Sequence, residues 1–308
     1  MRIRQSDLAA WARCPRQKHL RDVARERGDG EEILSATIFG TVMHYSVMLL
    51  ERLHLEGRED ACERAVEAFE HYWLPDNVTD LDPRATSITW LPRQSWGGLQ
   101  IRGRNTIRDY YEVLRNDSGV TLALEYPFTL PVELPTQGTH EAHGTVDRLV
   151  LRVKGTRSGT PYLAVEDFKT GKKPTYLRYA AQWTFYSWAS LQPDFWEAFR
   201  QAGELDRITE PLAQKGYALY ADGSGRPVIP RRGRWVSLRE QFSVHDAGWR
   251  TETDYARLMI AMDEYVRSCE AGIYPLNLTG DPCYYCPFSR NGMCAGIPLA
   301  EENEGEPT

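Results

Sequence analysis

The sequence predicts a mixed α/β protein, and three observations lead to that prediction. Apolar residues recur with helical spacing through most of residues 8–72, and the centre of the chain holds strand-like runs rich in β-branched and aromatic residues. A long helical pattern follows at residues 253–270. With 42% hydrophobic and 26% charged residues among 308, disordered and collagen-like classes are excluded, and we expect one large domain or two small ones.

The period of the apolar residues assigns each element in order. We expect helices at residues 8–72, including one at 38–53, and at 99–115, 177–191 and 253–270. We expect strands at residues 121–134, 143–153, 161–170, 216–221 and 232–244. Residues 74–98 are rich in Pro, Asp, Trp and Gly, which predicts a loop.

The net charge of -6 argues against a nucleic-acid partner, because phosphates are contacted by Lys and Arg. The charge is unevenly distributed, however. The first 27 residues hold eight basic and three acidic side chains, whereas the segment after Ala300 has four glutamates and no base. Further basic residues stand at Lys169, Lys172, Lys173, Arg231, Arg232, Arg234 and Arg239. The arginine cluster is either a solvated face or a phosphate-binding surface. The net charge therefore argues against a nucleic-acid partner, whereas the local clusters of basic residues are compatible with one.

No membrane or export segment is expected. The chain begins MRIRQSD, which leaves no room for the apolar core of a secretory signal. The longest apolar run, Ile38 to Leu50, is interrupted by polar residues and is shorter than the roughly 20 residues that a membrane span needs. We therefore expect a cytoplasmic protein.

Cysteines occur at positions 14, 62, 269, 283, 286 and 294. Cys283, Cys286 and Cys294 form a C-x2-C-x7-C pattern that needs a fourth ligand, and Cys14, beside Pro15 at a helix boundary, is the best candidate. Cys62 and Cys269 lie in helical stretches and are expected to pack as small apolar groups. The four remaining cysteines predict zinc or an iron-sulfur centre that would clamp the chain ends together, and unligated buried thiols are the alternative.

The central hairpin carries the sharpest chemical signal. Alternate residues of a strand share a face, so Asp167 and Lys169 point the same way. A hairpin centred on Arg157 pairs Asp147 with Asp167, whereas Glu166 faces the opposite side and is expected to be structural. Adjacent carboxylates favour a Mg²⁺ or Mn²⁺ ion between them, and a nearby lysine can offset charge on a phosphate, which suits phosphodiester hydrolysis. The alternative is a surface hairpin with scattered charges.

Seven motifs together resemble a known family. They are AWARCP, FGTVMH, GTVDRLV, VEDFKTG, QWTFY, AGIYPLN and CYYCPF followed by a last Cys, between about residues 5 and 295. The set resembles RecB-like PD-(D/E)XK nucleases that carry an iron-sulfur cluster, such as the CRISPR-associated RecB-like exonucleases, their phage relatives and AddB-type nuclease domains. The resemblance implies a restriction-endonuclease-like core, a central mixed sheet flanked by helices, with a helical insertion and an iron-sulfur clasp that joins the termini.

The resemblance also implies roles for individual residues. They are Asp147 and Asp167 as metal ligands, Lys169 as the catalytic lysine, His44 as the histidine that completes the metal shell, and Gln182 and Tyr186 as the Q-x3-Y motif. Without the resemblance, His44, Gln182 and Tyr186 would be expected to pack in or near the core. The same resemblance implies that Cys14, Cys283, Cys286 and Cys294 hold a structural 4Fe-4S cluster.

We therefore expect a divalent-metal-dependent DNA exonuclease that acts on single-stranded DNA or DNA ends in recombination, repair or spacer acquisition. Its parts are expected to be an N-terminal segment with one cluster cysteine at 1–30, a helical region with the histidine at 31–120, the nuclease core at 121–250, a C-terminal helix and cysteine cluster at 251–297, and a disordered acidic tail at 298–308. The alternatives are a DNA-binding or trimming subunit of a larger complex and a zinc-clasped RNA-processing nuclease. The resemblance allows a protein partner in a recombination or adaptation complex, and an oligomer.

Overall fold

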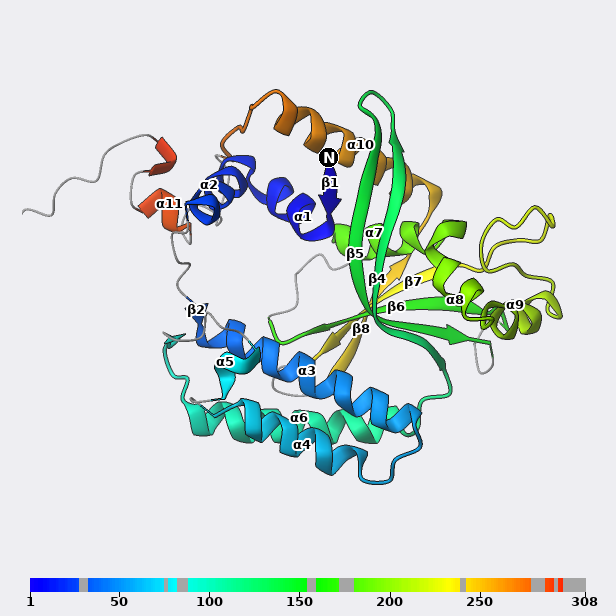
Figure 1. The fold of residues 1–308 in the computed structure, drawn as a ribbon, viewed down its shortest axis with the longest axis horizontal. Coiled ribbons are helices and arrows are strands. Elements are labelled where there is room, and N and C mark those ends of the chain that lie inside the picture. The colour runs from blue at the N-terminus through cyan, green and yellow to red at the C-terminus, as the bar shows by residue number, and fades with distance from the viewer. Residues whose placement is uncertain are drawn as a thin grey trace, which may run out of the picture. The chain divides into compact units, whose positions relative to one another are not determined.

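The computed structural model describes residues 1–27, 33–74, 77–81, 88–153, 159–171, 180–238, 242–277, 286–290 and 293–295. Cys283, Lys172, Lys173, Arg239 and the acidic tail lie outside these described residues. The chain divides into two compact units, which are described separately (Figure 1). Unit 1 comprises Met1–Glu31, Pro131–His143 and Ala256–Thr308, and unit 2 comprises Glu32–Leu130 and Gly144–Tyr255.

Unit 1 brings the two ends of the chain together. Its elements are β1 (Arg2–Arg4), α1 (Gln5–Arg13), α2 (Pro15–Glu26), most of α10 (Glu252–Glu270), α11 (Pro287–Arg290), η3 (Met293–Ala295) and the outer part of the β4–β5 hairpin. The Trp11 ring of α1 meets the Tyr265 ring of α10 edge-on at 5.9 Å, and Trp11 Nε1 donates to Ser268 Oγ at 3.3 Å. Asp263 of α10 accepts from Thr136 N at 2.7 Å and so holds the hairpin turn.

Unit 2 is built on a mixed sheet. Its strands are β4 (Val120–Leu134), β5 (Gly138–Arg152), β6 (Tyr162–Lys169), β7 (Arg231–Ser237) and β8 (Ser243–Trp249), of which β4 and β5 continue into unit 1. β6 pairs antiparallel with β5 and parallel with β7, and β8 pairs antiparallel with β7. β4 pairs with β5. A mixed sheet flanked by helices confirms the predicted fold class.

Helices cover both faces of this sheet (Figure 1). The helices of unit 2 are α3 (Ser35–Leu55), α4 (Ala61–Tyr72), α5 (Val78–Leu81), α6 (Trp96–Leu114), α7 (Ala181–Ala189), η2 (Pro193–Trp196), α8 (Glu197–Gln201) and α9 (Leu205–Ala213). α3, α4 and α6 form one apolar core with Phe168 and Val236 of the sheet, whereas α7 packs on the other face, where Trp183 Nε1 donates to the Arg234 carbonyl at 3.2 Å. None of the described helices combines the length and apolar character that crossing a membrane requires.

The predicted strand at residues 216–221 is wrong. Ala218 makes an isolated bridge to Val228, because Gly216, at φ +79°, redirects the chain after α9 and the Leu219 carbonyl accepts from the buried Arg231. The predicted strand at 232–244 is two strands, β7 and β8. The predicted loop at 74–98 contains α5 and β3 (Ile88–Thr89), which pairs in parallel with β2 (Ile33–Leu34). The predicted helices at 38–53, 99–115, 177–191 and 253–270 correspond to α3, α6, α7 and α10.

Candidate active site

The hairpin of β5 and β6 sets the site. Its predicted register is confirmed, because Arg148 lies opposite Glu166 and the pairing continues to Arg152 opposite Tyr162. Asp147 and Asp167 stand one position beyond the Arg148 pair and therefore lie side by side. There the Phe168 N–H donates to Asp147 Oδ2 at 2.8 Å. We call Asp147 and Asp167 the carboxylate pair.

Lys169 contacts the carboxylate pair from the same face. Its Nζ donates to Asp167 Oδ1 at 2.9 Å and lies 2.8 Å from Asp167 Oδ2. Gln182 of α7 donates a further hydrogen bond to Asp167 Oδ1. Lys169 of β6 and Gln182 of α7 therefore both contact the carboxylate of Asp167.

Burial sets the electrostatics of the carboxylate pair. Asp167 is 1% exposed, and burial together with the charge of Asp147 raises the pKa of Asp167 to about 7. Burial also raises the pKa of Asp147. Burial lowers the pKa of Lys169, but the charges of the carboxylate pair outweigh it and raise that pKa overall, which keeps the amine protonated. The ammonium group of Lys169 thus pairs with Asp167, and its charge also acts on Asp147.

The carboxylate pair has the chemistry of a divalent-cation site. Carboxylate oxygens are the ligands that Mg²⁺ and Mn²⁺ prefer. Asp167 Oδ2 is buried and, among the described residues, has no partner with hydrogen-bond geometry, although Lys169 Nζ is close to it. As the described side chains stand, no three His, Cys, Asp or Glu residues are spaced to hold one ion.

His44 reaches the site from α3. Its ring meets the Phe168 ring edge-on at 6.5 Å, and burial lowers the pKa of His44, which favours the neutral imidazole that can ligate a metal. One turn earlier on the helix, a Cβ on Gly40 would lie 2.9 Å from Thr170 Oγ1. The glycine of the FGTVMH motif thus lets α3 approach the end of β6.

Gln182 and Tyr186 lie one turn apart on α7 and differ in what they contact. Gln182 touches the carboxylate pair, whereas Tyr186 is 8% exposed and burial raises its pKa. A Cβ on Gly144 would come within 3.0 Å of the Tyr186 ring and 2.6 Å of the Phe128 ring. The glycine of the GTVD motif is therefore required for close packing of β5 beneath Tyr186.

A pocket of about 680 Å³ lies beside His44 and Lys169. It is lined by α3, by the end of β6 and by Glu125 of β4. The sequence reasoning missed Glu125, whose Oε1 lies 3.7 Å from His44 Nε2. Its signal in the sequence is weak, because a single acid in the run LALEYPF is equally typical of an exposed strand position.

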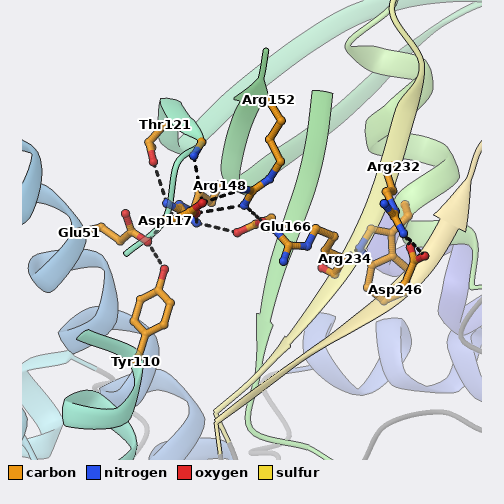
Figure 2. Close-up of polar contacts among 12 residues, drawn as sticks. Glu51, Tyr110, Asp117, Thr121, Arg148, Arg152, Glu166, Arg232, Arg234 and Asp246 are labelled. Carbon is orange, nitrogen blue, oxygen red and sulfur yellow. Dashed lines mark hydrogen bonds and ion pairs between the residues drawn. The ribbon is translucent and has the colours of Figure 1, made fainter. Parts of the chain in front are cut away.

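The opposite face of the hairpin carries a buried ion network (Figure 2). Arg148 Nη1 lies 2.8 Å from Glu166 Oε2, and Arg148 Nε lies 3.0 Å from Glu51 Oε1 of α3. Arg234 Nη1 donates to Glu166 Oε1 at 2.5 Å. The prediction that Glu166 faces away from the carboxylate pair is confirmed, and its side chain ties β5, β6 and β7 together.

The arginine cluster of β7 does not form a common basic surface. Arg231 is 1% exposed and donates to backbone carbonyls, including that of Leu219 at 2.6 Å. Arg232 pairs with Asp246 at 3.0 Å, as Figure 2 shows, and Arg234 pairs with Glu166. The sequence suggested either a solvated face or a phosphate-binding face. In the part of the cluster that the structure describes, the arginines are instead buried or ion-paired.

The cysteines lie in two environments. Cys14, Cys286 and Cys294 belong to unit 1, where Cys14 and Cys286 are buried and η3, which carries Cys294, packs against α2 and α11. Cys14 Sγ accepts from Gln17 N at 3.5 Å. These three are not positioned to ligate one ion in the described structure, so the cluster stays a prediction. Cys62 is buried in α4, and Cys269 is half-buried in α10.

Two adjacent aspartates and a lysine thus lie at the end of the central hairpin of this mixed sheet. Residues 2–291 match the family model described as PD-(D/E)XK nuclease superfamily, and the chain belongs to that superfamily. The family indicates a nucleic-acid substrate and a divalent metal, Mg²⁺ or Mn²⁺. A search of curated proteins finds no match.

Proposed function

We propose that the protein is a divalent-metal-dependent DNA exonuclease of the RecB-like kind, which acts on single-stranded DNA or DNA ends in recombination, repair or spacer acquisition. The observation that carries the nuclease part is the carboxylate pair with Lys169 on Asp167. The exonuclease and DNA parts rest on the resemblance of the seven motifs to RecB-like nucleases.

Asp147, Asp167 and His44 would hold the cation. When bound, the cation polarises the phosphodiester and offsets the negative charge that develops on it during hydrolysis. Lys169 keeps its proton beside Asp167 and so supplies further positive charge to the same phosphate. Gln182 fixes Asp167 by its hydrogen bond and thereby orients one of the two carboxylates.

Replacement of Lys169 or Asp147 by Ala tests this assignment. Cleavage of end-labelled single-stranded DNA with Mn²⁺ should fall by at least about 10³-fold, because these groups act in the transition state rather than in folding. Far-UV circular dichroism should be unchanged. Lys215→Ala is the matched control, because Lys215 is exposed and its Nζ donates to the Val153 carbonyl at 3.1 Å, outside the pocket.

The choice of substrates separates the alternatives. Mononucleotide release from single-stranded DNA or from duplex ends, with RNA intact, supports the exonuclease. Preferential cleavage of RNA favours an RNA-processing nuclease, and binding of DNA without cleavage favours a subunit that keeps the fold for assembly. Retained cleavage in the purified Asp147→Ala, Lys169→Ala double variant would contradict the assignment of the site.

We also propose that Cys14, Cys283, Cys286 and Cys294 hold a 4Fe-4S cluster. Three facts support it: Cys14 and Cys286 are buried in the same unit, the turn with Cys294 packs on the helix that follows Cys14, and Cys14 Sγ accepts a backbone hydrogen bond of the kind that tunes cluster thiolates.

Metal analysis of anaerobically purified protein tests the cluster. The protein should be brown and contain about four irons, a number that follows from the cluster type. Cys14→Ser should lose the iron and the visible absorption, whereas Cys62→Ser, at a buried cysteine outside the proposed set, should keep both. A colourless, active protein that contains zinc would contradict the proposal and leave zinc as the metal of the clasp.

A further inference from the structure

Tyr45 of α3 has an exposed aromatic side chain beside the candidate active site. It follows His44 directly in the chain and lines the same pocket as His44 and Lys169. Its exposed fraction is 37%, whereas Met43 and Val47 on the same helix are fully buried. A single exposed apolar residue needs no explanation by itself, so the surroundings of Tyr45 decide whether it has a function.

The ring of Tyr45 is held in place by α4. The helices α3 and α4 lie side by side (Figure 1), and the Tyr45 and Tyr72 rings meet edge-on with their centroids 4.9 Å apart. A hydrogen bond joins the two side chains and raises the pKa of Tyr72 above its ordinary value. An edge-on contact covers one face of one ring, whereas a stacked contact covers a face of both. The pair therefore orients Tyr45 and leaves part of its ring open to the pocket.

The α3 side of the pocket suits a nucleobase better than a phosphate. The charged residues among its described lining are Lys169 and Glu125, which both lie on strands, whereas α3 contributes Tyr45 and the hydroxyls of Thr37 and Thr41. Phosphates are bound by Lys and Arg, whereas unpaired bases are bound by stacking on aromatic rings and by hydrogen bonds to their edges. The volume of about 680 Å³ lies within the range of small-molecule sites, which includes sites for a nucleotide.

We propose that Tyr45 stacks on an unpaired base of the DNA strand next to the phosphate that is cleaved, and so favours single-stranded DNA over duplex DNA. The inference rests on the proposed function, because it concerns the strand bound at the same site. Bases inside a duplex are stacked on their neighbours, so a base must leave the duplex before it can meet the tyrosine ring. Stacking of one base on an aromatic side chain strengthens binding by about 5- to 150-fold, whichever base it is.

The rival explanation is that Tyr45 only packs against Tyr72 and stabilises the contact between α3 and α4. If packing is its only role, Tyr45→Leu should lower the stability of the fold, and the folded variant should bind DNA as the unaltered protein does. If Tyr45 stacks on a base, Tyr45→Leu should bind single-stranded DNA more weakly. Tyr45→Phe should keep the affinity that depends on the ring, although it loses the hydrogen bond to Tyr72.

Fluorescence anisotropy with a single-stranded oligonucleotide in EDTA tests the proposal without cleavage. One base is removed at a time along the strand, and an abasic site at one position should weaken binding by about 5- to 150-fold. Tyr45→Leu should weaken binding of the intact strand by a similar factor and should be insensitive to the abasic site at that position. This loss of sensitivity is the coupling that a direct contact between ring and base requires.

Tyr111→Leu is the matched control. Tyr111 is a partly buried tyrosine of α6 whose ring meets the His54 ring edge-on at 6.3 Å, and it does not line the pocket. Its replacement should leave both the affinity for the intact strand and the abasic profile unchanged. A blunt duplex is the second control, because Tyr45→Leu should leave the affinity for paired and stacked bases nearly unchanged.

Equal affinity of the unaltered protein for the intact strand and for every abasic strand would overturn the proposal, and this measurement does not depend on whether Tyr45→Leu folds. Loss of affinity in Tyr45→Leu that is the same for intact and abasic strands would also overturn it, as would absence of binding to single-stranded DNA. Cleavage of DNA by the unaltered protein would leave the proposed function standing in each of these cases. Coupling between Tyr45 and one base, without cleavage of any nucleic acid with Mn²⁺, would instead contradict the proposed function alone.

Discussion

Glu51 belongs to the buried ion network on the face of the β5–β6 hairpin opposite the carboxylate pair, and its burial affects the stability of the fold. The side chain is fully buried on α3, where Oε1 lies 3.0 Å from Arg148 Nε and accepts from the Tyr110 hydroxyl (Figure 2). Burial raises the pKa of Glu51 to about 7, because Arg148, which also pairs with Glu166, only partly offsets the loss of water. We therefore expect Glu51→Gln to change stability in a pH-dependent way.

The size and sign of the effect follow from proton linkage. The ordinary pKa of 4.5 rises to about 7 on folding, so the folded protein binds this proton more tightly than the unfolded chain does. The stability that protonated Glu51 provides is complete below pH 4.5 and is lost as the pH rises through 7. A shift of this size corresponds to about 3 kcal/mol above pH 7. Gln stays neutral, so Glu51→Gln should match the unaltered protein near pH 4.5 and be up to about 3 kcal/mol more stable at pH 8.

Urea unfolding of both proteins at pH 5, 6, 7 and 8 measures this difference. Glu70→Gln, at a partly exposed residue that pairs with Arg104, should change the free energy of unfolding by less than about 1 kcal/mol at every pH. If Glu51→Gln is instead less stable by about 3 to 5 kcal/mol at pH 8, the pair of the Glu51 carboxylate with Arg148 stabilises the fold by more than its burial costs. That result would refute the reasoning, as would a difference that does not change with pH.

Two further predictions concern packing and the site. Gly103→Ala would place a Cβ 2.1 Å from a ring carbon of Phe69 and should lower the free energy of unfolding by about 1 to 3 kcal/mol, whereas Gly97→Ala on the same helix, with nothing within 4 Å, should change it by less than about 1 kcal/mol. Thermal unfolding distinguishes them, and equal effects would contradict the packing argument. Gln182→Met removes the amide that holds Asp167 and should lower kcat by about tenfold without a change in DNA affinity; an unchanged kcat would show that this amide is not needed.

The carboxylate pair could be predicted because its geometry is local. Strand alternation puts Asp167 and Lys169 on one face, and a symmetric hairpin fixes the partner of each residue once its centre is chosen. The observed pairing of Arg148 with Glu166 is the register that a centre at Arg157 requires. His44 needed the family resemblance, because a histidine among apolar helix residues is typical of a packed core.

The ion network and Glu125 could not be predicted, because they depend on contacts between distant segments. Nothing local indicates that Glu51 of α3 will meet Arg148 of β5, or that Arg231 will be buried among carbonyls while its neighbour Arg232 pairs with an acid. The predicted strand at 216–221 failed for the same reason. The run GYALYA has the aromatic and apolar residues of a strand, but Ala218 makes an isolated bridge and the Leu219 carbonyl accepts from the buried Arg231 guanidinium.

The network and the candidate active site are coupled through the two strands that carry both. In β5 Asp147 precedes Arg148, and in β6 Glu166 precedes Asp167, so each aspartate has a network residue as its chain neighbour on the opposite face. Arg148 and Glu166 are also the last ladder pair before the aspartates, and their side chains meet at 2.8 Å. We therefore expect a change in this ion pair to disturb the spacing of β5 and β6 next to Asp147 and Asp167. Since a metal site tolerates only small changes in ligand position, we expect Arg148 and Glu166 to act as positioning residues for the carboxylate pair from the α3 face of the sheet.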